Sequence, residues 1–285
     1  MRILVLGASG MLGHAVVRVL ASSSEHSVVA VSRSLDLRNH FPALSSIESV
    51  IGIDAENSDA LITLFSRTRP DCVINCIGLV KQYREAEEPL AALPINAMLP
   101  HRLANLCRIG GARLIHISTD CVFQGTRGNY SEDDHSDAID LYGKSKYIGE
   151  VGGPDAITLR TSIIGHELGT THGLVEWFLA QEGSIKGYRR AVFSGLPTVE
   201  LARVIQNHVL PHPELNGLYH LAAEPISKYD LLTLVAKVYG KRIHIEPDDR
   251  VCIDRSLNGT RFREATGYQA PTWRALVDLM YANRA

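Results

Sequence analysis

Tyr142 and Lys146 stand four positions apart in the segment DLYGKSKYIGE and have side chains that can move a proton together. The segment 141–151 is predicted to be helical, and a spacing of four places both side chains on one face of a helix. A lysine ammonium lowers the pKa of a nearby phenol, which lets a tyrosine exchange a proton near neutral pH. Solvated helix faces carry the same spacing, so the pair alone leaves both interpretations open.

A hydroxyl-bearing segment precedes this pair, where the apolar stretch 114–117 runs into Ser118, Thr119 and Asp120. A side chain at the carboxyl end of a parallel strand lies in the crevice where such sheets bind ligands. Thr119 can donate a hydrogen bond to a substrate carbonyl there. A turn or helix cap is the alternative use of such residues, but the apolar run 121–123 fits it less well.

Three glycines open the chain in the segment VLGASGMLG, at Gly7, Gly10 and Gly13. They follow a predicted strand and begin a predicted helix, which is the setting of a dinucleotide-binding loop whose backbone approaches a pyrophosphate. The second strand ends in Ser32 and Arg33, which suit the 2′-phosphate of NADP better than the ribose hydroxyl of NAD. NADP is therefore the preferred cofactor and NAD the alternative, since Asp36 could serve a hydroxyl.

The elements that must position these residues alternate regularly. Short apolar strands are predicted at 3–6, 28–31, 72–76, 114–117 and 157–159, with helices at 11–21, 58–68, 91–109 and 141–151. This pattern predicts an α/β fold with a doubly wound, Rossmann-like parallel sheet. Residues 1–165 form the expected dinucleotide-binding domain, with a returning strand near 217–222. Residues 166–285, with helices at 173–181, 198–209, 228–239 and 272–282, form a smaller, mainly substrate-binding region.

Composition narrows the function classes. The 285 residues carry 29 basic and 31 acidic side chains, so no basic excess favours nucleic acid. No apolar stretch approaches the roughly 20 residues that cross a bilayer, and no secretion signal is recognised, so a cytoplasmic location is expected. The five cysteines are odd in number and lack a CxxC pair, which indicates reduced thiols, and the histidines lack metal-ligand spacing. A homodimer is compatible with the sequence.

The order of glycine loop, hydroxyl-bearing strand end and YxxxK is similar to the short-chain dehydrogenase/reductase superfamily. The segments HISTDCVFQG, DLYGKSKYIGE, LRTSIIG, FSGLPTVELA and RSLNGTRF resemble the dTDP-4-dehydrorhamnose reductase family of extended nucleotide-sugar reductases. The resemblance covers essentially the whole chain. It implies an NAD(P)H-dependent enzyme that reduces the 4-keto group of a nucleotide-linked 6-deoxysugar for surface polysaccharide synthesis.

The resemblance also implies roles for single residues. Thr119 would orient the sugar carbonyl, Tyr142 would protonate the developing alkoxide, and Lys146 would hold the cofactor ribose and lower the tyrosine pKa, while the nicotinamide supplies the hydride. Asp54 would lie near adenine, although a helix cap is its alternative role, and Asn96 would join a water relay near the lysine. The cofactor contacts so implied are Gly7, Ser9, Gly10, Met11, Leu12, Gly13, Ser32, Arg33, Asp54, Cys76, Ile77, Gly78, Asn96, Tyr142, Lys146, Thr161 and Ile163.

Two positions depart from the family pattern and leave the sugar open. Cys121 stands where the family commonly has tyrosine, and Ile163 where it has tryptophan, so the pocket loses aromatic surface. An N-acetylated sugar carried by UDP is as plausible as the rhamnose precursor. Thr119, Asp120 and Cys121 would contact the sugar. The candidate cations for its diphosphate are Lys81, Lys186, Arg189, Arg190 and Arg261. Trp177 and Phe178 are expected to fill the core.

Two rival functions share most of these features. An epimerase would retain NAD between half-reactions, and a relative of this family serves methionine adenosyltransferase as a non-catalytic, NADP-binding regulatory subunit. A 4,6-dehydratase is disfavoured, because it needs a second carboxylate where this chain has Cys121.

Overall fold

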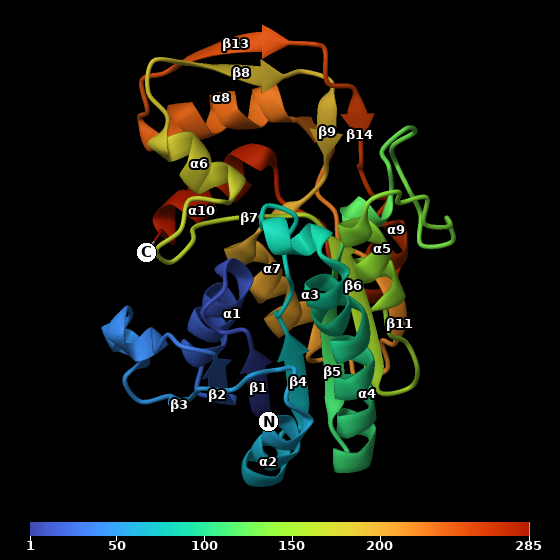
Figure 1. Ribbon diagram of the computed structural model, residues 1–285. Coiled ribbons are helices and arrows are strands. Elements are labelled where there is room, and N and C mark those ends of the chain that lie inside the picture. Colours follow the sequence, from blue (N-terminus) through green and yellow to red (C-terminus); the bar gives the residue numbers. More distant parts are fainter. Residues whose placement is uncertain (285) are drawn as a thin grey trace.

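A seven-stranded parallel sheet forms the centre of the computed structural model, which describes residues 1–284 (Figure 1). The strand order is β11-β6-β5-β4-β1-β2-β3, so the order reverses between β1 and β4. This confirms the doubly wound, Rossmann-like fold, in which ligands bind outside the carboxyl ends of the strands at the reversal point. The strands are β1 (Arg2–Leu6), β2 (Ser27–Ser32), β3 (Glu48–Ile51), β4 (Cys72–Asn75), β5 (Arg113–Thr119), β6 (Ala156–Thr161) and β11 (Gly217–His220).

Alternation along each strand builds a separate core on each face of the sheet. Ile3 and Val5 of β1 pack in one core with residues of α1 (Met11–Ala21) and α7 (Thr198–Val204). Leu4 and Leu6 pack in the other with α2 (Ser58–Thr68) and α4 (Leu99–Gly110). These four of the five β1 residues are fully buried, which is why the strand reads as an apolar run after Arg2.

Several helical segments depart from regular α geometry. The helix expected at 91–109 spans α3 (Pro89–Ala92), a π-helical η4 (Leu93–Met98) and α4, and the helix expected at 198–209 continues from α7 into a π-helical η6 (Ile205–Val209). α5 (Leu141–Ile148) ends before Gly149. Short 3₁₀ turns lie at η1 (Leu37–Asn39), η2 (Pro42–Leu44), η3 (Arg84–Glu87) and η5 (Asp120–Val122).

The C-terminal region lies over the carboxyl ends of the strands (Figure 1). Its core contains Phe178 of α6 (Leu174–Ala180), Leu231 of α8 (Lys228–Tyr239) and Val277 of α10 (Trp273–Ala282). Its remaining elements are β7 (Ile163–Ile164), β8 (Ser184–Tyr188), β9 (Ala191–Phe193), β10 (Leu196–Pro197), β12 (Ile226–Ser227), β13 (His244–Asp248), β14 (Ile253–Asp254) and α9 (Thr260–Thr266). The segment near 217–222 returns to the main sheet as β11, parallel to β6.

One expected core residue is not in the core. Phe178 is fully buried, but the neighbouring Trp177 is 38% exposed. Successive helical residues point about 100° apart, so a helix that packs on one side cannot bury both. None of the helices in the described chain combines the length and apolarity that a membrane span requires. Residues 1–284 also contain no group of three or more metal-ligating side chains.

Candidate active site

A cleft of about 550 Å³ separates the carboxyl ends of the central strands from the C-terminal region. The sheet side contributes residues that follow β1, β4, β5 and β6, together with Tyr142 and Lys146 of α5. The opposite wall includes Ala191, Val192 and Phe193 of β9. The cleft therefore lies where an open α/β sheet binds its ligand, and both regions of the chain line it.

The glycine loop joins β1 to α1 at one end of the cleft. Gly7 has a φ of +75°, which disfavours a side chain, and a Cβ on Gly13 would lie 2.0 Å from the Gly7 carbonyl oxygen. The loop can turn this tightly only because both residues lack side chains. Gly10 immediately precedes α1 and lines the cleft with Met11 and Leu12, so the helix N-terminus is available to stabilise an anion. This geometry fits a dinucleotide pyrophosphate.

Thr119 is the last residue of β5 and lines the cleft. Its hydroxyl accepts a hydrogen bond from the Cys121 amide at 3.1 Å and donates one to the Asp120 carboxylate at 3.3 Å. Burial raises the pKa of Asp120, and the positive charge of Arg255 opposes that rise. Thr119 is thus fixed at the strand end by the short turn that follows it.

α5 presents Tyr142 and Lys146 to the same cleft, as the spacing predicted. The helix begins after Asp140, whose carboxylate accepts a hydrogen bond from the Gly143 amide at 2.7 Å. The buried Lys146 ammonium donates to the Ile117 carbonyl oxygen at 2.7 Å. Burial lowers the pKa of Lys146 to about 8, and the negative charge of Glu150 opposes this.

The expected lowering of the tyrosine pKa is not what this cleft produces. Burial raises the pKa of Tyr142, and the nearby Cys121 thiol and Asp120 carboxylate act in the same direction. The neighbouring Thr119 hydroxyl lowers it. The phenol is therefore held in its protonated form, the form that can donate a proton.

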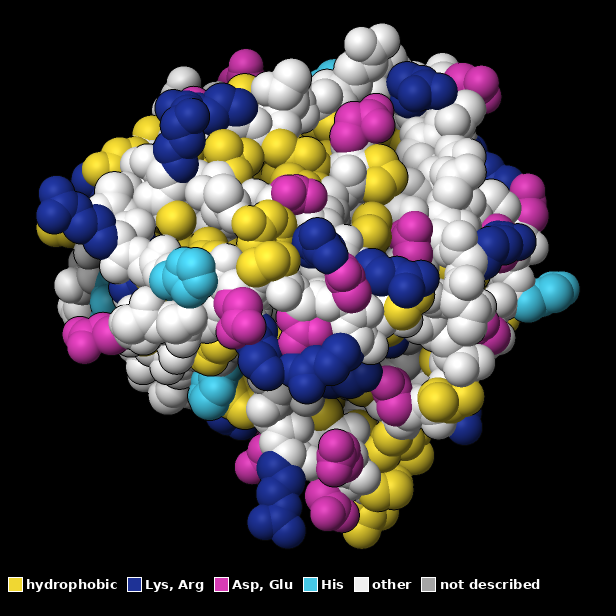
Figure 2. All heavy atoms as spheres, turned by 90° about the horizontal axis from the view of Figure 1, so that it is seen from above, with side chains coloured by type: hydrophobic (Ala, Val, Ile, Leu, Met, Phe, Trp, Pro, Cys, Tyr) yellow, Lys and Arg dark blue, Asp and Glu magenta, His cyan; other side chains and the backbone are white. Residues whose placement is uncertain are grey.

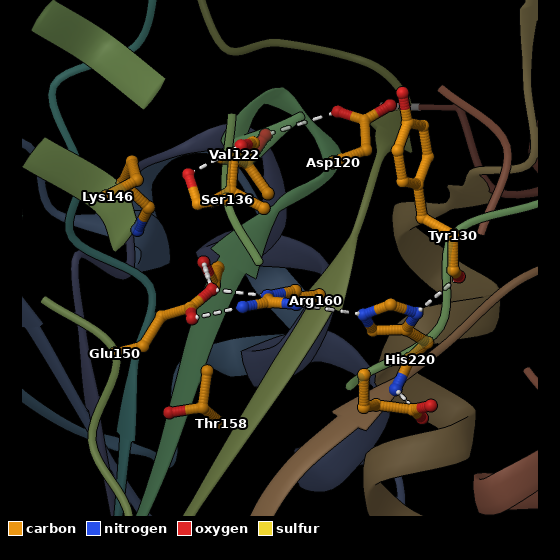
Figure 3. Close-up of polar contacts among 12 residues, drawn as sticks. Asp120, Val122, Tyr130, Ser136, Lys146, Glu150, Thr158, Arg160 and His220 are labelled. Atoms are coloured by element: carbon orange, nitrogen blue, oxygen red, sulfur yellow. Dashed lines mark hydrogen bonds and ion pairs between the residues drawn. The ribbon is translucent and has the colours of Figure 1, made fainter. Parts of the chain in front are cut away.

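A buried polar network continues from α5 across the sheet edge (Figure 3). Glu150 accepts hydrogen bonds at 2.7 Å from Ser118 and from the Arg160 guanidinium. On its other side, Arg160 of β6 donates to His220 Nε2 at 3.3 Å, and His220 Nδ1 donates to the Tyr130 carbonyl oxygen at 3.0 Å. Burial and the Arg160 charge lower the pKa of His220 to about 3, so its imidazole is neutral. The network ties β11 to the residue beside Thr119.

Asn96 lies beside the site but does not line the cleft. It is 1% exposed, and its side-chain amide exchanges two hydrogen bonds with the Leu79 backbone, at 2.9 and 3.0 Å. It also donates to the Ser145 hydroxyl at 3.3 Å. Asn96 thereby holds the segment after β4 against α5.

The expected cofactor contacts fall into two groups. Cys76, Ile77, Gly78, Thr161 and Ile163 line the cleft together with the helix start. The others do not: Gly7 and Ser9 lie in the loop after β1, Gly13 lies in α1, Ser32 ends β2, and Arg33 and Asp54 follow β2 and β3.

The residues at the end of β2 and after β3 have distinct environments. Ser32 donates a hydrogen bond to the Leu35 carbonyl oxygen, and Asp54 accepts one from the Glu56 amide at 2.9 Å, as a local turn. The Asp36 carboxylate is bound by the guanidinium of Arg38, which lowers its pKa to about 2. Arg33 is exposed and makes no ion pair within residues 1–284. A cation is thus available at the end of β2, while the Asp36 carboxylate is engaged.

Only one of the predicted substrate cations reaches the cleft. Lys81 lines it and forms an ion pair with Asp140. Lys186 lies on β8 and Arg189 and Arg190 in the turn after it, where Arg189 pairs with Asp249, while Arg261 of α9 pairs with Asp133. On the upper face of the C-terminal region, basic and acidic side chains are interspersed (Figure 2). Lys186, Arg189, Arg190 and Arg261 thus lie outside the cleft, and their assignment to the substrate diphosphate stays a prediction.

Two other cations line the cleft and were missed. Lys228 begins α8, and Arg255 follows β14, where its guanidinium donates to the Phe123 carbonyl oxygen at 2.7 Å. Arg255 is the first residue of the motif RSLNGTRF, which also contains Arg261. Tyr83 and His172 also line the cleft and meet edge to face, with ring centroids 4.9 Å apart.

Comparison with known proteins finds one family model and several relatives that are similar to this chain. A family model described as RmlD substrate binding domain matches residues 1–284. A dTDP-4-keto-6-deoxy-D-glucose reductase of Streptomyces niveus is 30% identical over 264 residues, 88% of this chain and 84% of the relative. Methionine adenosyltransferase 2 subunit beta of Danio rerio is 28% identical over 253 residues, covering 84% and 74%. The structure of dTDP-4-dehydrorhamnose reductase from Bacillus anthracis in complex with NADP has a similar fold, with a TM-score of 0.78, 21% identity and coverage of 99% and 98%.

Proposed function

Since the chain belongs to the dTDP-4-dehydrorhamnose reductase family, represented by the RmlD substrate binding domain, we propose that it reduces the 4-keto group of a nucleotide-linked 6-deoxysugar with a nicotinamide cofactor. The observation that carries the proposal is the meeting of Thr119, Tyr142 and Lys146 in one cleft beside the start of α1. A hydroxyl, a phenol and an ammonium are thereby grouped where the sheet binds its ligand.

The cofactor in this proposal is NADPH. Its pyrophosphate would lie at Gly10, Met11 and Leu12, where a helix N-terminus opens on the cleft. Arg33 would hold the 2′-phosphate, because it has no carboxylate partner among residues 1–284 while Asp36 is bound by Arg38. The related enzyme from Bacillus anthracis is in complex with NADP, which supports the choice. When bound, the nicotinamide supplies the hydride.

The chain's own residues would donate the proton and bind the substrate carbonyl. Tyr142 keeps its proton in this environment and would donate it to the alkoxide that forms on reduction. Thr119, held by its contacts with Asp120 and Cys121, would donate a hydrogen bond to the same oxygen. Lys146 would bind the cofactor ribose from its position on the next helical turn. Tyr142 is the residue on which turnover depends most.

Residues 166–285 would mainly bind the substrate. Lys228 and Arg255 are the cations that this region brings to the cleft, and they would pair with the two phosphates that link nucleotide and sugar. Cys121 and Ile163 line the cleft with small or aliphatic side chains, which leaves room for a substituted sugar. The product would serve surface polysaccharide synthesis.

One assay tests the proposal directly. Oxidation of NADPH and NADH by the purified chain is followed with dTDP-, UDP- and GDP-linked 4-keto-6-deoxysugars, and each product is identified by NMR. Turnover with one sugar that disappears in Tyr142→Phe supports the reductase. NAD that co-purifies in a one-to-one ratio, with inversion of a sugar centre and no net oxidation, would contradict it and indicate an epimerase.

A regulatory subunit is the second candidate function, because methionine adenosyltransferase 2 subunit beta matches most of the chain. This candidate predicts cofactor binding without turnover on any sugar of the panel. It also predicts a stable complex with a methionine adenosyltransferase catalytic subunit, measured by size-exclusion chromatography of the mixed proteins. Turnover of a nucleotide sugar together with separate elution would exclude it.

A further inference from the structure

A second groove, of about 420 Å³, lies along the middle and end of α1, whereas the cleft borders only the first residues of that helix. Its walls come from α1, from α7 and η6, and from the end of α10, and these helices lie near the C-terminus (Figure 1). We call it the α1–α7 groove and define it by His14, Arg18, Thr198, Arg203, Gln206 and Asn207. Among residues 1–284, no residue lines both this groove and the cleft.

The charged side chains that line the α1–α7 groove are all basic within the described residues. Arg18 and Arg203 line it, and no Asp or Glu does so within the described residues. Neither arginine forms an ion pair in residues 1–284, whereas the buried Arg160 is paired with Glu150. The Arg18 guanidinium donates to the Asn283 carbonyl oxygen at 3.0 Å and lies 4.6 Å from the Phe41 ring centroid. Burial lowers its pKa, and no carboxylate opposes this. An anion would supply the missing counter-charge.

The other polar side chains of the groove are neutral and suit the hydroxyl groups of a ligand better than its charged groups. Gln206 and Asn207 lie in the π-helical η6, and their side chains make no hydrogen bond within residues 1–284. Widened π turns occur frequently at functional sites. The other π segment of this chain, η4, carries Asn96 beside the cleft. The His14 imidazole donates from Nε2 to the His166 carbonyl oxygen, which leaves its buried Nδ1 an acceptor without a partner.

We propose that the α1–α7 groove binds a phosphate ester that carries hydroxyl groups. Arg18 and Arg203 contact the phosphate, because a guanidinium offers paired donors that match its oxygens. Gln206 and Asn207 bind the hydroxyls, since each amide can both donate and accept. The site is distinct from the proposed catalytic cleft and does not depend on the reductase activity.

The test is isothermal titration calorimetry of the full chain with glucose 1-phosphate, glucose and inorganic phosphate at matched ionic strength. We expect saturable one-to-one binding of glucose 1-phosphate, with glucose at least about tenfold weaker and inorganic phosphate several-fold weaker. Equal affinity for the ester and for inorganic phosphate would overturn the assignment of Gln206 and Asn207 to hydroxyls. Absence of saturable binding would overturn the site.

Variants locate the binding. Arg203→Gln and Arg18→Gln are each expected to weaken the binding of glucose 1-phosphate by about tenfold or more. A tenfold loss of affinity corresponds to about 1.4 kcal/mol. The exposed Arg203 can change without disturbing the core, so its variant separates loss of binding from loss of fold. Arg67→Gln on α2 is the matched control for charge, and Lys228→Gln the control for the cleft. Binding that persists in both groove variants, or that vanishes with Lys228→Gln, would place the ligand elsewhere and refute the proposal.

Discussion

Glu150 and Arg160 form a buried ion pair, in which two guanidinium nitrogens each donate to a different carboxylate oxygen at 2.7 Å. The arginine side chain is 2% exposed and the glutamate 11%. The pair connects the end of β5 to β11 at the edge of the sheet. Glu150 also binds Ser118, next to Thr119, and Arg160 binds His220 of β11. The Glu150 carboxylate also favours the charged form of Lys146.

Glu150→Gln should therefore affect both stability and pH dependence. The Arg160 guanidinium loses its counter-charge in the interior, so we expect the free energy of unfolding to fall by about 3 kcal/mol or more. The pKa of Lys146 should fall too, which moves the alkaline loss of activity to lower pH. Urea denaturation and the pH profile of kcat measure the two effects.

A matched double variant separates pairing from packing. In Glu150→Met with Arg160→Met, neither member of the pair leaves an unpaired buried charge, so the protein should be more stable than Glu150→Gln alone. If the double variant were the less stable of the two, the pair would act through its shape and not through its charge.

Tyr142→Phe should remove the proton donor and little else. The phenol is partly accessible from the cleft, and phenylalanine retains its ring. We expect kcat to fall by about a hundredfold or more, with the dissociation constant for NADPH unchanged. Stopped-flow turnover and fluorescence titration measure the two quantities. Unchanged kcat would remove Tyr142 from the mechanism.

Arg33→Ala should distinguish the two cofactors. A cation that binds a 2′-phosphate does nothing for a 2′-hydroxyl, so NADPH should bind about tenfold more weakly while NADH is unaffected. Arg67→Ala, at another exposed arginine, is the control. Equal losses for both cofactors would show that Arg33 does not contact the 2′-phosphate.

Lys146→Met should stabilise the protein at neutral pH while abolishing activity. Burial lowers the lysine pKa from 10.5 to about 8, so the folded state bears a cost of about 3 kcal/mol below pH 8. The variant also loses the hydrogen bond to Ile117, which costs about 1 kcal/mol. The free energy of unfolding should therefore rise by about 2 kcal/mol.

The sign of the pH dependence follows from the same shift. Below pH 8 the folded and unfolded forms both hold the proton and the full cost is present. Between pH 8 and about 10.5 only the unfolded form keeps it, so this group makes stability rise with pH. The advantage of Lys146→Met should shrink across that window in urea denaturation. If the difference in free energy of unfolding between the variant and the wild type stayed constant across this pH range, the Lys146 ammonium would not be the source of the destabilisation.

Lys228→Ala should weaken substrate binding selectively. If Lys228 pairs with the substrate diphosphate, KM for the nucleotide sugar should rise about tenfold, with KM for NADPH unchanged. Lys186→Ala is the matched control, since Lys186 lies outside the cleft. A rise in KM for the sugar in both variants would point to a general charge effect.

Local patterns account for the parts of the site that the sequence predicted. The glycine loop and the Tyr142–Lys146 pair each lie within one turn or helix, so their geometry depends on neighbouring residues only. The adjacent residues Trp177 and Phe178 show the limit of such patterns. Composition marks both as apolar, but the packing of α6 decides that only Phe178 is buried.

Long-range pairing explains the cations that the sequence did not reveal. Ser227 pairs with Val192 in antiparallel register, and Asp254 pairs with Val192 in parallel register. These pairings bring Lys228 and Arg255, each the next residue along the chain, to the cleft wall. The strands involved contain only two or three residues, too few for any periodicity to register.

The position of β11 at the sheet edge has a consequence for biosynthesis. A ribosome releases β6 long before it releases residues 217–220, and until then the edge of β6 has no neighbour on that side. Arg160 meanwhile lacks its contact with His220. Residues 1–165 therefore cannot finish folding during their own synthesis but wait for the later part of the chain, and a gene split near codon 165 would yield two incomplete products.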